Sequence, residues 1–491
     1  MIFMPVLSKE NIKRALYYMK RNGPINTYYA AKEEILEGRK APYEPYVLSE
    51  EERERQRKWA VMNDSIKFSI VVPTYNTPKF FLKELLSSVL NQTYHNFQLI
   101  LADASEDNIV KRELDFYLKS LPAEMHGERV HYMKLTKNAG ISENTNDGIL
   151  EADGDYIGLL DHDDVLTEDA LYEMARAIYA GKYEDETGAS DKLFSRTNIV
   201  HGRPKMVYSD EDKCNEGGTE FTEPHYKLDF KSDYLLSNNY ICHFTVIEGD
   251  LLKKLLLRKE FDGAQDFDLV LRVWLEDDRT IVHVPKVLYH WRCHNNSTAG
   301  NPQSKEYAYE AGRRAVQAAV DSLGWDAEAV GIRHLGFYRL DYRSDPFKFR
   351  EQLGAIGGRV VKGSRAGKVI GGAMDENGAG YYFGLPAAYS GYMHRAVLSQ
   401  GVEALDLRCF RLRKELWPLF KEVTGMNYID TPAALRADST ATVNQWDRIF
   451  DYRTLPKGCD IPCLSYDLSE AIIKEGYTLL YQPEWETVWR K

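Results

Sequence analysis

The sequence predicts an α/β fold whose central sheet is mostly parallel, over about residues 66–330. Two observations support this prediction: short apolar, β-branched runs alternate with helical patterns, and polar residues follow each run. Strands that alternate with helices favour parallel pairing through right-handed crossovers. The elements expected in the first half are Phe68–Val72, Lys79–Asn91, Phe97–Ala102, Ile109–Lys119, Val130–Leu135, Ser142–Glu151 and the strand that ends at Asp161.

The alternation continues in the second half of this segment. The elements expected there are the strand Met206–Tyr208, a loop over 209–213, the strand Ile241–Ile247, the helix Gln265–Glu276, the strands Thr280–Val284 and Lys286–His290, and the helix Ser304–Leu323. Residues 181–204 are polar and predict a surface insertion. Residues 1–65 predict polar helices, one of them opened by a capping box at Ser49–Glu52.

Length and composition narrow the class of protein. A chain of 491 residues predicts two or three domains, and 44% hydrophobic and 28% charged residues are typical of a soluble globular protein. A net charge of −11 argues against a nucleic-acid partner. Six cysteines form no disulfide or zinc pattern, and no apolar run is long enough to span a membrane. Met1–Pro5 lacks the basic flank of a signal peptide, so we expect a cytoplasmic location.

The hexapeptide Leu159–Asp164 is the most informative motif, because an apolar strand ends there in three carboxylates. In an extended backbone Asp161 and Asp163 project to the same side. Clustered buried acids are costly unless a cation or ligand compensates them, and hard oxygen ligands suit Mg²⁺ or Mn²⁺ that also holds substrate phosphates. The alternative is a solvated turn after a strand.

Other polar residues follow the neighbouring expected strands. Asp103 and Asn138 come just after their strands, as Asp161 does. In parallel sheets the ligand lies beyond the carboxyl ends of the strands. These residues are therefore expected on one rim, around a single site.

Six segments, in order, resemble inverting family 2 glycosyltransferases with the nucleotide-diphosphosugar transferase (GT-A) fold. They are SIVVPTYNTP, LADASEDN, NAGISENTNDGILEADGDYIGLLDHDD, YSDEDK, FDGAQDFDLVLR and VLYHWRCHNNSTA. The chain is most similar to bacterial transferases that build rhamnose-containing or O-antigen-like surface polysaccharides. The resemblance implies metal-dependent transfer of a sugar from a nucleotide-diphosphosugar to a glycan acceptor, which a lipid could carry at the inner face of the membrane.

The resemblance also implies roles for residues on the nucleotide side. Pro73, Tyr75 and Asn76 match the loop that holds the base and ribose, and Asn138, Gly140 and Ile141 match the segment under the nucleotide and donor sugar. Asp103 matches an acid that binds the pyrimidine, with a helix N-cap as the alternative. The family often has a second Asp next to it, where this chain has Ala104. Recognition of the base could therefore be looser or rebuilt.

Further roles follow on the metal and acceptor sides. Asp161 and Asp163 match the metal and ribose positions, and Asp164 could orient the loop. His290 resembles the late histidine of the metal or diphosphate site, Arg292 would neutralise the leaving diphosphate, and His294 completes this cluster. Asp266 matches the catalytic base, with a helix cap as the alternative, and Gln265 replaces an acid that many relatives have. Asp210–Lys213 resembles an acceptor-side segment or a solvated charge run.

The C-terminal part contains an eroded repeat. YDLSEAIIKEGYTLLYQPEWETVWRK repeats the helix, strand and Pro-to-Trp-Arg spacing of FDLVLRVWLEDDRTIVHVPKVLYHWR. Ser465 stands in the place of Asp266, and Val488 in the place of His290. We therefore expect a helical extension over 1–65, a GT-A domain over 66–330 and a degenerate, non-catalytic half-domain over 331–491. That half-domain could dock on the first domain, bind the acceptor or be purely structural.

Two other functional classes stay open from the sequence. A sugar-phosphate nucleotidyltransferase would use the same rim, but it normally has a Gly-rich phosphate loop, and VVPTYNTPK is not one. An inactive carbohydrate-binding scaffold is disfavoured because Asp163, Asp266 and His290 are all present.

Overall fold

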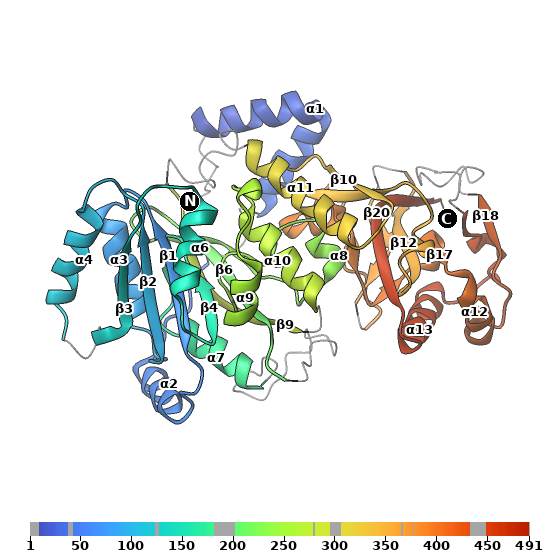
Figure 1. The fold of residues 1–491 in the computed structure, drawn as a ribbon. Coiled ribbons are helices and arrows are strands. Elements are labelled where there is room, and N and C mark those ends of the chain that lie inside the picture. The colour runs from blue at the N-terminus through green and yellow to red at the C-terminus, as the bar shows by residue number, and fades with distance from the viewer. Residues whose placement is uncertain are drawn as a thin grey trace. The chain divides into compact units, whose positions relative to one another are not determined.

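Contacts divide the chain into two compact units (Figure 1). The computed structural model describes residues 9–37, 43–122, 127–180, 202–277, 280–294, 306–364, 367–375, 377–432 and 448–490. We call Pro42–Phe230 with Asn239–Ala319 the central unit. The C-terminal unit comprises Met1–Ala41, Lys231–Asn238 and Val320–Lys491. No helix in the described part of the chain is long and apolar enough to cross a membrane.

Four parallel strands form one half of the central sheet, as the sequence predicted (Figure 1). The strand that contains Phe68 lies between two of the others: Phe68 pairs with Phe97 on one side and with Tyr156 on the other. The sheet order is β3 (Val130–Lys134), β2 (Phe97–Asp103), β1 (Phe68–Thr74) and β4 (Tyr156–Leu159). Every residue of β1 and β2 is buried, which explains why their apolar runs are nearly continuous.

The connecting helices also match the prediction, within two residues at each end. They are α3 (Lys79–Leu90), α4 (Ile109–Lys119) and α6 (Ile141–Glu151). Helix α6 lies close against the sheet because it carries Gly148, where a Cβ atom would meet Cγ1 of Val71 at 2.6 Å. Its N-terminus is thereby held beside the end of β1.

The other half of the sheet is mixed. It contains β8 (Thr245–Glu248), β6 (Met206–Cys214), β9 (Ile281–Arg292), β5 (Val165–Leu166) and β7 (Phe221–His225). Strand β8 is antiparallel to both β4 and β6, whereas β6 and β9 are parallel. The remaining helices of the central unit include α7 (Ala170–Ala180), α9 (Gly249–Leu255), α10 (Gln265–Glu276) and α11 (Glu306–Ser322), whose last residues belong to the C-terminal unit.

Three predictions for this half were wrong. The expected loop over 209–213 is part of β6, because its carboxylates are buried and paired with histidines. The two strands expected around Pro285 are one strand, β9, which absorbs the proline in an irregularity of its pairing with β6. The strand expected from Ile241 begins only at Thr245. Most of the predicted insertion over 181–204 lies outside the described residues.

The N-terminal helices are distributed between the two units. Helix α1 (Lys9–Glu37) belongs to the C-terminal unit and α2 (Glu50–Met62) to the central unit. The predicted capping box of α2 is confirmed, since the Glu52 N–H donates to Ser49 Oγ and the Ser49 N–H donates to the Glu52 carboxylate. The division into 1–65, 66–330 and 331–491 stays a prediction about the modules of the chain.

The C-terminal unit has its own five-stranded sheet. It consists of β13 (Val369–Gly371), β12 (Leu353–Lys362), β20 (Thr478–Trp489), β15 (Gln400–Gly401) and β17 (Phe410–Leu412). The other helices and strands of this unit are α8 (Ser232–Leu235), α12 (Trp417–Thr424), α13 (Ile461–Lys474), β10 (Ala327–Gly331), β11 (Tyr338–Tyr342), β14 (Ala373–Met374), β16 (Ala404–Leu405), β18 (Asp430–Pro432) and β19 (Arg448–Phe450).

The strand pairing of this sheet repeats that of the central unit. Strand β12 pairs in parallel with β20, as β6 does with β9. Strand β20 follows helix α13, as β9 follows α10. Strand β17 is antiparallel to β12 as β8 is to β6. In the central unit, β6 and β9 pair Met206–Ile281, Glu211–Tyr289 and Asp212–His290. The corresponding pairs of β12 and β20 in the C-terminal unit are, in the same order, Ala355–Leu479, Val360–Thr487 and Val361–Val488. Both parallel pairs are irregular next to the proline, so the repeat seen in the sequence is also present in the strand register.

Candidate active site

The acidic loop begins directly after β4 and is held by β9. Asp164 is buried, and its carboxylate accepts hydrogen bonds from the Tyr289 hydroxyl and, at 2.7 Å, from the Arg292 backbone N–H. Burial raises the pKa of Asp164 well above its usual range, and the neighbouring Asp163 and Asp161 raise it further. Asp164 therefore orients the loop, as the sequence suggested.

Asp161 lies at the mouth of the site. Its side chain is exposed and lines the pocket described below. Desolvation by the surrounding protein raises the pKa of its carboxyl; the charge of His243 lowers it, and Asp163 raises it. Such a carboxylate gains from a cation or a hydrogen-bond donor brought by a ligand.

The histidine beside Asp163 is His294. Its Nε2 lies 2.8 Å from Asp163 Oδ2. The sequence assigned the metal role to His290, but Nδ1 of that residue lies 2.6 Å from Oδ1 of the buried Asp212, on β6. The two histidines differ because His290 is inside β9, next to β6, whereas His294 follows the end of β9 at Arg292.

Arg292 is completely buried. Its Nε donates to the Asp163 carbonyl at 2.6 Å, its Nη1 donates to the Glu216 carbonyl at 2.7 Å, and its guanidinium lies over the rings of Phe80 and Phe81. The sequence placed Arg292 on the leaving diphosphate. In the structure it supports the backbone of the acidic loop instead.

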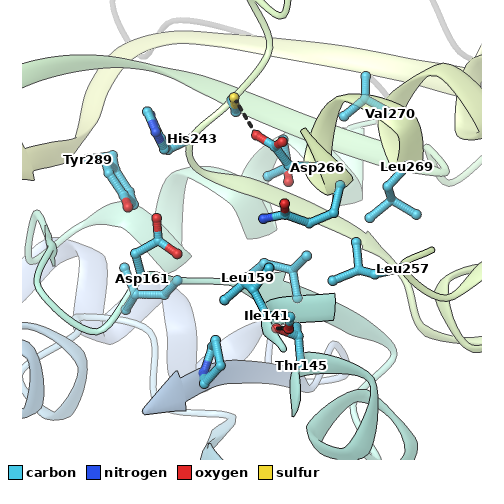
Figure 2. A pocket seen from close by; sticks show the side chains of 15 residues that line it. Ile141, Thr145, Leu159, Asp161, His243, Leu257, Asp266, Leu269, Val270 and Tyr289 are labelled. Carbon is cyan, nitrogen blue, oxygen red and sulfur yellow. Dashed lines mark hydrogen bonds between the residues drawn. The ribbon is translucent and has the colours of Figure 1, made fainter. Parts of the chain in front are cut away.

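Asp266 stands in the first turn of α10 and points into the pocket (Figure 2). Asn239 Nδ2 and Cys242 Sγ each donate to its Oδ2 at 3.0 Å. Within the described residues no hydrogen bond ends on Oδ1. One oxygen is thus anchored while the other can accept a proton.

The pocket joins the two halves of the central unit. Its walls come from the ends of β1 and β4, from α6, from the segment before β8, from the start of α10 and from β9. Asp161 and Asp266 reach into it from different elements, with His243 and Tyr289 on the same side as Asp161 (Figure 2). The lining residues are Pro73, Ile141, Thr145, Leu159, Leu160, Asp161, Cys242, His243, Thr245, Leu257, Gln265, Asp266, Leu269, Val270 and Tyr289.

His243 is a pocket residue that the sequence analysis missed. Glu211 accepts hydrogen bonds from its backbone N–H and, at 3.0 Å, from its Nδ1. Burial alone would lower the pKa of His243, but Glu211, Asp164 and Asp161 outweigh it and raise the pKa to about 9. A signal was available: Glu211 belongs to the acidic run Asp210–Asp212, which was expected to be a loop.

The nucleotide-side residues lie around the ends of β1 and β2. Pro73 lines the pocket, and the Tyr75 side chain is exposed. Asn76 has a φ of +51°, and its N–H donates to Ser105 Oγ at 2.8 Å. This bond fixes the loop after β1 to the loop after β2.

Asp103 is fully buried at the end of β2. Burial by itself would raise its pKa, but hydrogen bonds from Ser105, Tyr132 and Lys134 outweigh it and lower the pKa. Asp103 is therefore a charged anchor for neighbouring loops, and its role toward a pyrimidine stays a prediction.

Asn138 and Gly140 shape the start of α6. Asn138 Oδ1 accepts from Asn144 Nδ2 at 2.9 Å and from the Gly140 N–H at 3.2 Å. Gly140 has a φ of +105°, and a Cβ atom there would lie 2.9 Å from Asp262 Oδ2. The tight turn therefore requires glycine at this position.

The described side chains do not by themselves complete a metal cage. No group of three or more His, Cys, Asp or Glu residues is arranged to hold an ion within the described ranges. Asp163 and His294 meet directly and would supply two ligands. This fits Mg²⁺ or Mn²⁺ sites in which substrate phosphates and water complete the coordination.

Comparison with known proteins identifies a family for part of the chain. Residues 69–256 match the model of the family described as Glycosyl transferase family 2. This segment of the chain is therefore similar to that family, which agrees with the resemblance inferred from the sequence. The predicted α/β class is confirmed by the central sheet and its helices.

Curated relatives match about half of the chain. The "Uncharacterized protein y4gI" of Sinorhizobium fredii is 39% identical over 252 residues, which cover 51% of this chain and 25% of that protein. The "O-antigen biosynthesis protein RfbC" of Myxococcus xanthus is 28% identical over 275 residues, 56% of this chain and 19% of that protein. The chain therefore spans a quarter or less of the length of these relatives.

A solved structure also aligns with about half of this chain. The crystal structure of S. aureus TarS 1–349 in complex with UDP-GlcNAc aligns with a TM-score of 0.39 and 18% identity, covering 52% of this chain and 66% of that chain. Similarity at this TM-score carries no argument about the site.

Proposed function

We propose that the protein is an inverting, metal-dependent glycosyltransferase of the hexosyl- or rhamnosyltransferase class. It would move a sugar from a nucleotide-diphosphosugar to a saccharide acceptor in the synthesis of a bacterial cell-surface polysaccharide. One observation carries the proposal: Asp161 and Asp266 face one pocket from the two halves of the central unit, in a chain whose residues 69–256 match the family 2 model. The relative RfbC, named for O-antigen biosynthesis, supports the class of product.

Asp266 is the proposed catalytic base. Its Oδ2 is anchored by Asn239 and Cys242, so Oδ1 can take the proton of the acceptor hydroxyl. The acceptor oxygen then forms a bond to the anomeric carbon, and the bond between that carbon and the diphosphate breaks. A direct displacement of this kind inverts the configuration of the anomeric carbon.

Asp161, Asp163 and His294 are the proposed donor-diphosphate and metal residues. Asp163 and His294 would hold Mg²⁺ or Mn²⁺, and Asp161 would contact the ribose or the metal. A bound divalent ion would neutralise charge on the leaving diphosphate. Pro73, Tyr75, Asn76, Asp103, Asn138 and Gly140 are proposed for the nucleotide side.

The acceptor and the location are also part of the proposal. A lipid-linked oligosaccharide would place a cytoplasmic enzyme at the inner face of the membrane. The C-terminal unit is proposed to be non-catalytic, because Ser465 stands there at the position of the proposed base Asp266.

Release of nucleoside diphosphate tests the proposed function. The full chain is incubated with a panel of UDP-, dTDP- and GDP-sugars and Mn²⁺, together with the variant Asp266→Asn. We expect the wild type to release nucleoside diphosphate from one donor, and the variant to bind that donor but lose turnover by about 10²-fold or more. Release of pyrophosphate from a nucleoside triphosphate and a sugar phosphate would point to a nucleotidyltransferase instead. Absence of binding to every donor would refute the proposal.

A further inference from the structure

A buried acid holds His243 at the pocket. Glu211 accepts from the His243 backbone N–H and from its Nδ1, so both the position and the plane of the ring are determined. The ring also stacks on Tyr289, with centroids 5.3 Å apart and planes 11° from parallel. With Nδ1 engaged, Nε2 is the nitrogen that remains for a ligand.

A buried lysine completes this arrangement. The Lys227 side chain has no exposed surface, and its Nζ donates to Glu211 Oε2 at 3.3 Å and to the carbonyls of Ile241 and Cys242 at 2.9 and 2.6 Å. Lys227 thus fixes both Glu211 and the backbone segment that carries His243. Burying a charged pair costs several kcal/mol unless its geometry is good. The presence of Glu211 and Lys227 in the interior therefore calls for a structural or functional explanation.

The C-terminal unit shows that strand pairing is not this explanation. Val360 stands at the position of Glu211, and Val361 at that of Asp212, in the same register. Both valines are fully buried. The same sheet is therefore built without these carboxylates, in a unit that also lacks a counterpart of Asp266.

The charges around the pocket indicate what His243 binds. Of the described residues that line the pocket, His243 alone has a basic side chain, whereas Asp161 and Asp266 are acidic. Arg292 does not line this pocket: it is buried, its Nε and Nη1 donate to backbone carbonyls, and its Nη2, without a partner among the described residues, is buried as well. An anionic ligand that enters this pocket next to Asp161 would meet one cationic group, the imidazole of His243.

We propose that His243 donates a hydrogen bond from Nε2 to the β-phosphate of the donor nucleotide, and that Glu211 and Lys227 are positioning residues for it. This inference rests on the proposed function, because it assumes a nucleoside diphosphate in the pocket. It adds a diphosphate-binding residue that is distinct from Asp163 and His294.

Nucleoside diphosphates and monophosphates together test the proposal. Binding of UDP, dTDP and GDP, and of UMP, dTMP and GMP, is measured by calorimetry with Mn²⁺ for the wild type and His243→Ala. We expect diphosphate affinity to fall about 10- to 100-fold, the range for a hydrogen bond to a charged group, while monophosphate affinity stays unchanged. An unchanged ratio of the two affinities, or an equal loss of both, would overturn the role of His243.

The positioning role needs a second comparison. Glu211→Gln is expected to weaken diphosphate binding in the wild-type background and to have no further effect in the His243→Ala background. Glu173→Gln is the matched control, since Glu173 is also a buried glutamate and pairs with Lys286 outside the pocket. It should lower the melting temperature without changing diphosphate affinity. A loss by Glu211→Gln that persists in the His243→Ala background would show a merely structural role.

The outcomes separate the two proposals. If the wild type binds a diphosphate and His243→Ala binds it equally well, the inference fails and the proposed function stands. If the wild type binds none of the diphosphates, the proposed function fails and the role of His243 fails with it.

Discussion

Asp163 Oδ2 and His294 Nε2 lie 2.8 Å apart, although 131 residues separate them in the chain. The contact joins the loop after β4 to the segment after β9. It brings together a carboxylate and an imidazole, both of which bind divalent metals, at the open end of the acidic loop. His290, inside β9, contacts Asp212 instead.

The two histidines should therefore respond differently to substitution. His294→Ala should raise the Mn²⁺ concentration needed for half-maximal nucleoside diphosphate binding by about tenfold or more, because a ligand is lost. His290→Ala should leave that concentration unchanged but lower the melting temperature, because it leaves the buried Asp212 unpaired. Mn²⁺ titration and thermal melts measure both effects. The reverse result would restore His290 as the metal residue.

Arg292→Lys should act through the fold of the acidic loop. A lysine cannot donate to the carbonyls of Asp163 and Glu216 together, so we expect a loss of about 2–4 kcal/mol in unfolding free energy along with weaker diphosphate binding. Arg490→Ala is the control, because Arg490, the counterpart of Arg292 in the repeat, is exposed. Normal stability of Arg292→Lys with slow turnover alone would instead support direct contact with the leaving group.

Gly140→Ala should destabilise the start of α6. The φ of +105° is strained for alanine, and its Cβ would lie 2.9 Å from Asp262 Oδ2, so we expect a cost of about 1–3 kcal/mol. Gly217→Ala, where the nearest atom would be Thr219 Oγ1 at 3.7 Å, should cost much less. Urea denaturation of both variants measures the difference. Equal stability of the two would show that the turn can relax.

Two stacked histidines make the C-terminal unit sensitive to acid. The rings of His334 and His394 have centroids 3.7 Å apart, and burial lowers the pKa of His394 to about 4, with Arg333 adding to the effect. The unfolded chain binds this proton below about pH 6.5, so stability should fall between pH 6.5 and 4.

The size of this effect can be measured with one substitution. At pH 5 the His394 contribution amounts to a loss of about 2 kcal/mol relative to pH 7.5. His394→Asn tolerates the φ of +60° at this position and should reduce the fall in melting temperature between the two pH values. An identical fall in wild type and variant would show that His394 does not set the acid sensitivity.

Local sequence patterns were sufficient to predict the strands and helices in the first half of the central sheet. The strands that begin at Phe68 and Phe97 are buried on both faces, so their hydrophobicity alone was enough to predict them. The second half was harder, because Asp210, Glu211 and Asp212 look like a solvated loop in sequence. They form a strand because His283, His243 and His290 lie beside them, and these partners are distant in the chain.

The order of residues and motifs was enough to predict the α/β class, the resemblance to family 2, the acidic loop, the position of Asp266 at the start of a helix and the C-terminal repeat. Each of these depends on neighbours in the chain or on the order of motifs. Three-dimensional packing was needed to show that His294 rather than His290 contacts Asp163, that Arg292 is buried and that Glu211 holds His243 at the pocket. Those relationships depend on which side of a strand a residue faces and on what lies across from it, and long-range packing sets both.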